Sequence, residues 1–401
     1  MLTSLSFIFL VGLAMGAICQ KLKLPRIIGM LATGIVLGPY VLDLLDSGIL
    51  SISSDLRKMA LIIILLKAGL SLNLEDLKKV GRPAIMMAFV PATFELIGYL
   101  VFAPLILGIT RVEAAVMGSV LAAVSPAVVV PRMVQLMENK YGTEKAIPQM
   151  IMAGASCDDI FVIVLFTTFL SMAQGGSADI KAFVNIPISI ILGIILGAIV
   201  GYLLYLFFET AYAKKHYVRN SMKVIIVLGF SFLLIAIEGW LEGKIAVSGL
   251  LAVVSMACVL KMKCTSFVSK RLSEKFGKLW FAAEVILFVL VGAAVDIRYT
   301  LDAGLAAVAM IFAALIFRSF GVWLCTVKTS LTLKERAFCV IAYLPKATVQ
   351  AAIGSVPFAA GLPCGKIVLS VAVMAIIITA PLGAFGMDFT YKKFLHKESE
   401  R

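Results

Sequence analysis

The stretch "AAVSPAVVVPRM" (residues 122–133) interrupts a long apolar run with two prolines. A second stretch, "AYLPKATVQAAIGSVP" (residues 342–357), also contains two prolines and adds Gly354. Each proline removes a backbone hydrogen-bond donor and disfavours a continuous helix. We therefore expect two helices that break near their middle. At membrane depth such breaks are tolerated only where the freed backbone groups lie within protein or beside a polar cavity.

The composition places both stretches in a membrane protein. Of 401 residues, 61% are hydrophobic and 15% are charged, and the mean hydropathy is +1.05. Soluble domains have about 45–50% apolar and about 25% charged residues. This excludes a soluble enzyme, and the sequence contains no nucleotide-binding loop, catalytic triad or paired metal-ligand spacing. We expect neither enzymatic activity nor a cofactor.

Apolar runs of about 17–25 residues, long enough to cross a hydrocarbon core of roughly 30 Å as helices, recur along the chain. The thirteen expected spans are residues 3–19, 27–42, 54–72, 83–107, 113–137, 146–172, 184–209, 222–240, 245–262, 279–297, 303–327, 337–358 and 363–387. Short polar connections join these spans. They predict one all-α integral membrane domain over residues 1–401.

The distribution of Lys and Arg predicts the orientation. With the N-terminus outside, the cytoplasmic loops and C-terminal tail hold 26 of the 36 basic residues, and the outer loops hold 7. This asymmetry follows the positive-inside rule for a multi-pass protein of the plasma or inner membrane. It also accounts for the net charge of +13 through contact with anionic inner-leaflet lipid, without nucleic acid. The basic stretch at 261–278 is read as a cytoplasmic loop.

These counts assign basic residues towards the ends of spans to the adjoining loops, which leaves three inside the spans, namely Lys67, Arg318 and Lys346. A bare charge at the bilayer centre costs at least about 2.5–3.5 kcal/mol, so such residues usually face the bundle interior and mark an ion path. Lys67 lies near the cytoplasmic end of its span and can extend to the interface. Arg318 and Lys346 lie near mid-span and are candidates for a functional site.

Acidic residues lie at the same depth. The apolar segment "GASCDDIFVI" sets Asp158 beside Asp159, about 18 Å inside its helix. Glu95 is the third midspan acid. Together with Arg318 and Lys346, these acids form one candidate site of five charges.

An internal repeat relates some of these positions. The segments "LLKAGLSLNLEDL" (65–77) and "VLVGAAVDIRYTL" (289–301) align with an offset of 223, which pairs Asn73 with Asp296. The same offset pairs Glu95 with Arg318, and a shift of seven spans reverses the direction of the second copy. The pattern predicts an inverted repeat. A Glu95–Arg318 ion pair across its axis would reduce the burial cost of both charges.

Four stretches together resemble the cation/proton antiporter superfamily, specifically the sodium/hydrogen antiporter branch related to animal NHA exchangers. They are "LKLPRIIGMLATGIVLGP", "SPAVVVP", the adjacent "DD" and "LPKATVQAAIG". The resemblance implies a fold of inverted repeats, a homodimer and an elevator motion. It also implies a moving core at 83–172 and 303–387, and a dimerisation scaffold at 3–72 and 184–297. The G-x-x-x-G of the first span, in "VGLAMGAIC", is then expected at the dimer interface.

The resemblance also assigns roles to the ion site. Asp159 matches the main ion ligand and Asp158 its acidic neighbour, and Ser125 with carbonyls of the first broken helix would complete a shell around sodium. Lys346 matches a residue that stabilises the second broken helix.

Glu95 and Arg318 match a charged pair typical of this branch. Electrogenic members often have lysine where Arg318 stands, so the sequence leaves open whether exchange is electrogenic or electroneutral.

The expected function is secondary active antiport of sodium or lithium against protons, serving pH homeostasis. Burial and a neighbouring charge both disfavour an ionised carboxylate, so Asp158 and Asp159 can trade a proton for a cation. Because both ions need the same oxygens, competition between them yields exchange. A potassium/proton antiporter, a sodium-coupled organic-anion symporter, and a channel or membrane sensor are the alternatives.

Overall fold

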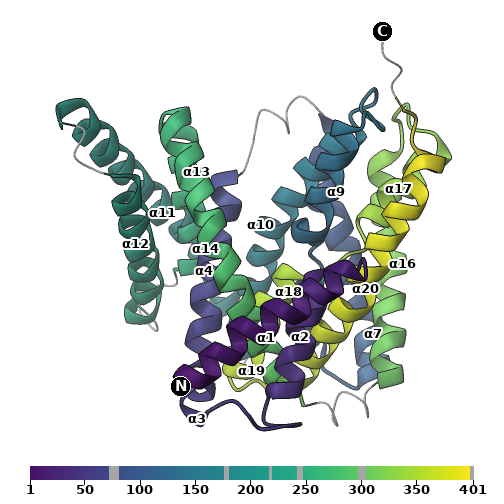
Figure 1. The fold of residues 1–401 in the computed structure, drawn as a ribbon, viewed down its shortest axis with the longest axis horizontal. Helices are drawn as coiled ribbons and strands as arrows, with labels where there is room; N and C mark the ends of the chain where they lie inside the picture. The colour runs from purple at the N-terminus through teal and green to yellow at the C-terminus, as the bar shows by residue number, and fades with distance from the viewer. Residues whose placement is uncertain (72–80, 176–179, 216–218, 242–246, 297–303, 398–401) are drawn as a thin grey trace. The chain divides into compact units, whose positions relative to one another are not determined.

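The computed structural model describes residues 1–401 except 72–80, 176–179, 216–218, 242–246, 297–303 and 398–401 (Figure 1). The described residues form helices and contain no strand beyond one isolated antiparallel bridge between Tyr141 and Lys397. The all-α fold class is confirmed.

The helices are α1 (Leu2–Lys21), α2 (Arg26–Leu37), α3 (Ser47–Ser51), α4 (Ser53–Ser71), α6 (Arg82–Met87), α7 (Val90–Leu107), α8 (Arg111–Leu121), α9 (Pro126–Glu138), α10 (Ile147–Gln174), α11 (Ile180–Lys215), α12 (Asn220–Leu241), α13 (Gly249–Lys263), α14 (Ser266–Ala293), α16 (Gly304–Thr326), α17 (Leu333–Ala342), α18 (Thr348–Gly354), α19 (Val356–Ala359) and α20 (Gly365–Phe394). Within the described residues, nine helical segments are long and apolar enough to cross a membrane. The other four expected spans fall on α2, α4, α13 and the series α17 to α19.

One expectation about the spans is wrong. The basic stretch at 261–278 was expected to be a loop, but α14 begins at Ser266. Val268, Leu272 and Phe276 recur every four residues and are buried. This apolar stripe packs against the protein while the basic side chains lie on the other faces, so the segment folds as an amphipathic extension of the span.

The chain divides into two compact units. Unit 1 comprises 1–57, 73–162 and 285–401, and unit 2 comprises 58–72 and 163–284. Both broken helices and all five midspan charges fall in unit 1. In unit 2, α11 packs on α13. The division into a moving core and a dimerisation scaffold remains a prediction.

In unit 1, α1, α2 and the last part of α14 pack through glycine. A Cβ atom added at Gly34 of α2 would lie 1.9 Å from the Val289 carbonyl oxygen, and one at Gly292 would lie 2.3 Å from the Leu31 carbonyl oxygen. Only glycine allows the two helix backbones to approach this closely.

The G-x-x-x-G of α1 belongs to the same packing. Both Gly12 and Gly16 are buried, and a Cβ atom at Gly12 would lie 3.0 Å from a Val289 methyl carbon. The expectation that these glycines face a second protomer is therefore wrong. The exposed face of α1 instead carries Leu10, which is 67% exposed.

The inverted repeat is visible in the two broken helices. The first is interrupted between α8 and α9, and the second between α17 and α18. Both α8 and α17 begin with a capping box, formed by Thr110 with Glu113 in the first copy and by Thr332 with Glu335 in the second, 222 residues later. The two preceding helices, α7 and α16, pack directly against each other.

Polar contacts tie together the helix ends near the C-terminus of unit 1. Lys145, which precedes α10, forms a 2.8 Å salt bridge with Glu335 at the start of α17. Arg132 of α9 binds Asp388 of α20 through two nitrogens, at 3.0 and 3.1 Å. Helix α9 is therefore attached to α20, and the α9–α10 connection is attached to α17.

Replacing Gly34 by Ala should destabilise unit 1 by about 1–3 kcal/mol, because the new methyl group overlaps a backbone carbonyl that cannot rotate away. Gly229 of α12, where an added Cβ has no neighbour within 4 Å, is the matched control. Gly229→Ala should leave the melting temperature unchanged or raise it slightly. Thermal unfolding in detergent measures both. Equal melting temperatures for the two variants would contradict the packing.

The Lys145–Glu335 pair should make stability pH-dependent. Burial raises the pKa of Glu335, but hydrogen bonds from Lys145 and Thr332 outweigh it and hold the pKa below the ordinary 4.5. The pair therefore stabilises the fold fully above about pH 4.5, and its contribution is lost as the pH falls further.

Glu335→Gln should accordingly lower the melting temperature at pH 7 and lower it less at pH 4, where part of the stabilisation from the ionised pair is already lost. The exposed neighbour Glu144, changed to Gln, is the control and should have little effect at either pH. A Glu335→Gln deficit that is the same at pH 7 and pH 4 would exclude this origin.

Candidate ion-binding site

The two broken helices cross at their extended segments. Ser125, which precedes α9, donates its backbone N–H to the carbonyl of Pro345 at 2.8 Å. On the other side, the Lys346 backbone N–H donates to the Thr379 hydroxyl of α20 at 2.9 Å. These two freed N–H groups are thus partnered inside the protein, as burial at this depth requires.

The carbonyl end of α8 receives donors from the second copy. The last carbonyls of a helix have no partner within it and carry partial negative charge. Here Lys346 Nζ donates to Leu121 O, Arg318 Nη1 donates to Ala122 O, and Gln350 Nε2 donates to Ala123 O. Two cations and one amide therefore cap this end.

Glu95 neutralises both cations. Its Oε2 lies 2.7 Å from Arg318 Nη1, and Lys346 Nζ lies 2.6 Å from its Oε1 and 2.8 Å from its Oε2. All three side chains are 0% exposed. The Glu95–Arg318 pair expected from the repeat is present, and Lys346 joins it.

Arg318 connects this network to the paired aspartates of α10. Its Nη2 lies 3.3 Å from Asp158 Oδ2, and the same oxygen accepts the Val124 N–H at 2.7 Å. Asp159, the next residue, is 5% exposed. The structure thus brings Asp158 to the first broken segment, beside Ser125.

Several buried oxygens near the crossing accept no hydrogen bond from the described residues. They are Asp158 Oδ1, Ser125 Oγ and Thr348 Oγ1. Hard cations such as sodium prefer oxygen ligands of these kinds. The carbonyls of residues 121–123 are different, since positively charged groups or an amide already bind them. They are poor ligands for a cation. Of the carbonyls of the first broken helix that were expected to bind sodium, these three are therefore unsuitable.

Three further polar residues complete the site without having been predicted. The Tyr343 carbonyl accepts a hydrogen bond from Arg318 Nε at 2.6 Å, and the centre of the Tyr343 ring lies 5.5 Å from the guanidinium carbon of Arg318. Thr379 and Gln350 hold the second broken segment. Tyr343 and Gln350 fall in the stretch 342–357 that the sequence marks as a broken helix, and Thr379 is a polar side chain in an apolar run.

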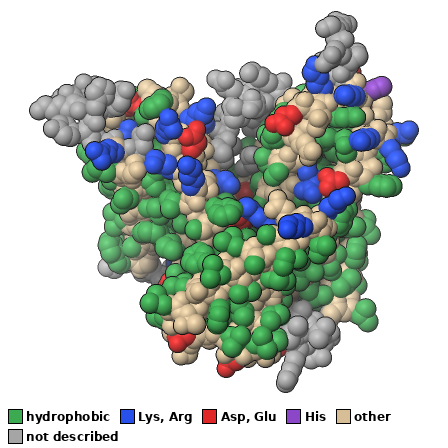
Figure 2. Space-filling view, viewed as in Figure 1, with side chains coloured by type: hydrophobic (Ala, Val, Ile, Leu, Met, Phe, Trp, Pro, Cys, Tyr) green, Lys and Arg blue, Asp and Glu red, His purple; other side chains and the backbone are tan. Residues whose placement is uncertain are grey.

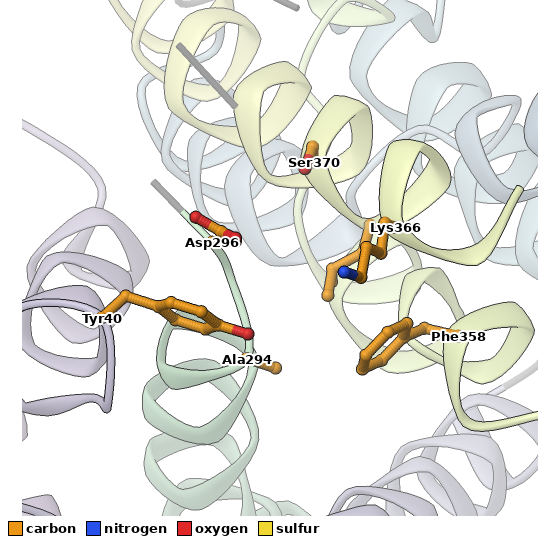
Figure 3. A pocket seen from close by; sticks show the side chains of 7 residues that line it. Tyr40, Ala294, Asp296, Phe358, Lys366 and Ser370 are labelled. Carbon is orange, nitrogen blue, oxygen red and sulfur yellow. The ribbon is translucent and has the colours of Figure 1, made fainter. Parts of the chain in front are cut away.

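Some other candidates lie away from this network. Lys67 belongs to unit 2, where its ammonium lies 5.9 Å from the centre of the Trp280 ring. Asn73 lies outside the described residues. Its repeat partner Asp296 lines a small cavity with Tyr40, Lys366 and Ser370, which contains none of the five network charges (Figure 3). The described residues contain no cluster of His, Cys, Asp and Glu suited to a resident metal.

Neutralising Glu95 should destabilise the protein strongly. Glu95→Gln removes the carboxylate that pairs with both Arg318 and Lys346, and breaking a buried pair costs about 3–5 kcal/mol. Exposed Glu138, changed to Gln, is the control. Exchanging Glu95 and Arg318 should not rescue stability, because the new arginine would face Lys346 and the new glutamate Asp158. Thermal unfolding measures each variant, and a swap that restores the wild-type melting temperature would contradict this network.

Known proteins have sequences similar to this chain, and solved structures have a similar fold. A family model described as "Sodium/hydrogen exchanger, transmembrane" matches residues 5–392. Sodium/hydrogen exchanger 9B2 of Xenopus tropicalis is 31% identical over 377 residues, covering 87% of this chain and 65% of that protein. The Mus musculus 9B2 protein is 33% identical over 394 residues, covering 94% and 70% respectively.

Among solved structures, the sodium proton antiporter MjNhaP1 from Methanocaldococcus jannaschii superposes with a TM-score of 0.82. The match covers 98% of both chains at 20% identity, which supports the inverted-repeat membrane fold. The family model spans nearly the whole chain, and the relatives match at more than 30% identity. This multi-pass membrane protein belongs to the sodium/hydrogen exchanger family.

Proposed function

We propose that the protein is a secondary active antiporter that exchanges sodium or lithium for protons. The observation that carries the proposal is the position of Asp158, fully buried where two broken helices cross and held there by Val124 and Arg318. Family membership and the names of the relatives support the same activity. The transported cation is the substrate.

The aspartates, rather than the basic residues, carry the exchanged charge. Arginine does not deprotonate in proteins, and Arg318 is held by Glu95, Asp158 and two backbone carbonyls. Asp158 and Asp159 can each hold either a proton or part of a cation shell. A cation that binds their ionised oxygens, with the Ser125 hydroxyl, displaces the proton. Competition for the same oxygens is sufficient to couple the two fluxes.

The charge network supports a rigid-body motion of the site. Glu95 of α7, Arg318 of α16 and Lys346 between α17 and α18 join both copies of the repeat in one buried cluster. Moving one copy alone would separate these charges at a high cost. We infer an elevator motion in which the network travels intact with its ion, in a homodimer whose scaffold stays in place.

The surface charge of unit 1 supports the proposed orientation. Figure 2 shows Lys and Arg side chains gathered over the ends of α17 and α20, near the C-terminus, and acidic side chains near α3 at the opposite end. With the positive-inside rule, this favours a cytoplasmic C-terminus and an outside N-terminus in the cell membrane. Basic side chains at that end can also bind anionic lipid.

Asp159→Asn should abolish sodium-driven proton flux in proteoliposomes, and Asp158→Asn should abolish it or reduce it strongly, because an amide can neither release a proton nor balance a cation. The exposed Asp55 in the first turn of α4, changed to Asn, is the control. All three variants should elute as folded protein.

Flux assays with lithium, potassium and an organic anion in place of sodium separate the alternatives. A preference for potassium would indicate a potassium/proton antiporter, and anion-dependent sodium uptake would indicate a symporter. Near-normal sodium exchange in the Asp159→Asn variant would contradict the assignment of Asp159 to the ion-binding site.

A further inference from the structure

Gln350 joins the two broken segments through one side-chain amide. Its Oε1 accepts the Ala347 N–H at 2.8 Å, in the second segment, and its Nε2 donates to Ala123 O at 2.8 Å, in the first. A longer contact of 3.5 Å reaches Leu121 O. The side chain is 0% exposed. A single side chain of α18 therefore links the two backbones, in addition to the direct bond between the Ser125 N–H and the Pro345 carbonyl.

The pattern of donor and acceptor is specific. A buried amide is costly unless both its ends are bonded, and here both are. An apolar side chain of similar size would leave the Ala347 N–H and the Ala123 carbonyl without this partner. Lysine or arginine could donate to Ala123 O but could not accept from Ala347. A protonated glutamic acid, which has nearly the same shape as glutamine, has an acceptor oxygen and an O–H donor and can form both bonds.

The Ala123 carbonyl is part of the peptide group that precedes Val124. The N–H of that group, on Val124, is the donor that holds Asp158 Oδ2 at 2.7 Å. Fixing the carbonyl oxygen on one side of this peptide plane therefore fixes the direction of the N–H on the other side. Through this one peptide plane, Gln350 is coupled to the carboxylate without touching it.

We propose that Gln350 is a positioning residue for the ion site, which sets the peptide group between Ala123 and Val124 so that its N–H holds Asp158 for the cation. The proposal rests on the proposed antiport function. It assigns Gln350 no contact with the cation or the proton. The role is separate from that of Lys346, which neutralises Glu95.

The variant Gln350→Glu tests this role, because a change of pH switches its side chain between a form that resembles glutamine and a form that does not. When protonated, the glutamic acid accepts from Ala347 and donates to Ala123 O, as the amide does. When ionised, it loses the donor and places a negative charge against that carbonyl. Acid pH should therefore restore the hydrogen bonds to the Ala347 N–H and the Ala123 carbonyl, and alkaline pH should remove the bond to Ala123. Both states can be compared in one purified protein.

The expected result is a sodium KM close to the wild-type value at acid pH and raised about tenfold relative to wild type at alkaline pH, which is the effect of one lost buried hydrogen bond. The KM should return when the pH is lowered again. Thermal unfolding over the same range should show folded protein throughout. Gln350→Leu should raise the KM at every pH. Gln135→Glu, at an exposed position of α9, should follow the wild-type profile.

Two outcomes would overturn the proposal: a Gln350→Glu profile that follows wild type at every pH, or an equal loss at every pH. Absence of sodium/proton exchange in the wild-type protein would instead contradict the proposed function. The inference about Gln350 and the function on which it rests therefore fail in different experiments.

Discussion

The structure depends on the need to bury four charges within one apolar helix bundle. Glu95, Arg318, Lys346 and Asp158 are all 0% exposed, and any one of them alone would be prohibitively costly at this depth. Each is placed within 3.3 Å of an opposite charge. The network has two positive and two negative members, so it is close to neutral before Asp159 or a transported ion is counted.

The broken helices make this network possible. A continuous α8–α9 helix would bond its own carbonyls, and Arg318 and Lys346 would lose them as hydrogen-bond acceptors. The break at residues 122–125 instead frees carbonyls at the end of α8, and their partial negative charge adds to that of Glu95. The same break frees the Val124 N–H for Asp158. The cost of interrupting a helix is offset by a site that binds charge of both signs.

Sequence patterns predicted the parts of the site that depend on spacing. The offset of 223 predicted the Glu95–Arg318 pair, and the prolines predicted both breaks. The offset did not predict that Lys346 would bind Glu95, because its long side chain reaches across the crossing to a position unrelated by the repeat. The partners of Gln350 depend on the separation of two segments more than 220 residues apart along the chain. Glycine spacing in α1 predicted a close contact but could not tell α14 from a second protomer.

The central claim is that a proton and a cation compete for the same buried carboxylates. The most direct test is the sodium KM of the wild-type protein in proteoliposomes, measured at several pH values with the maximum rate determined at each. Competition predicts that the KM rises steeply as the pH falls while the maximum rate at saturating sodium changes much less. A KM that is constant with pH, accompanied by a falling maximum rate, would contradict a shared site.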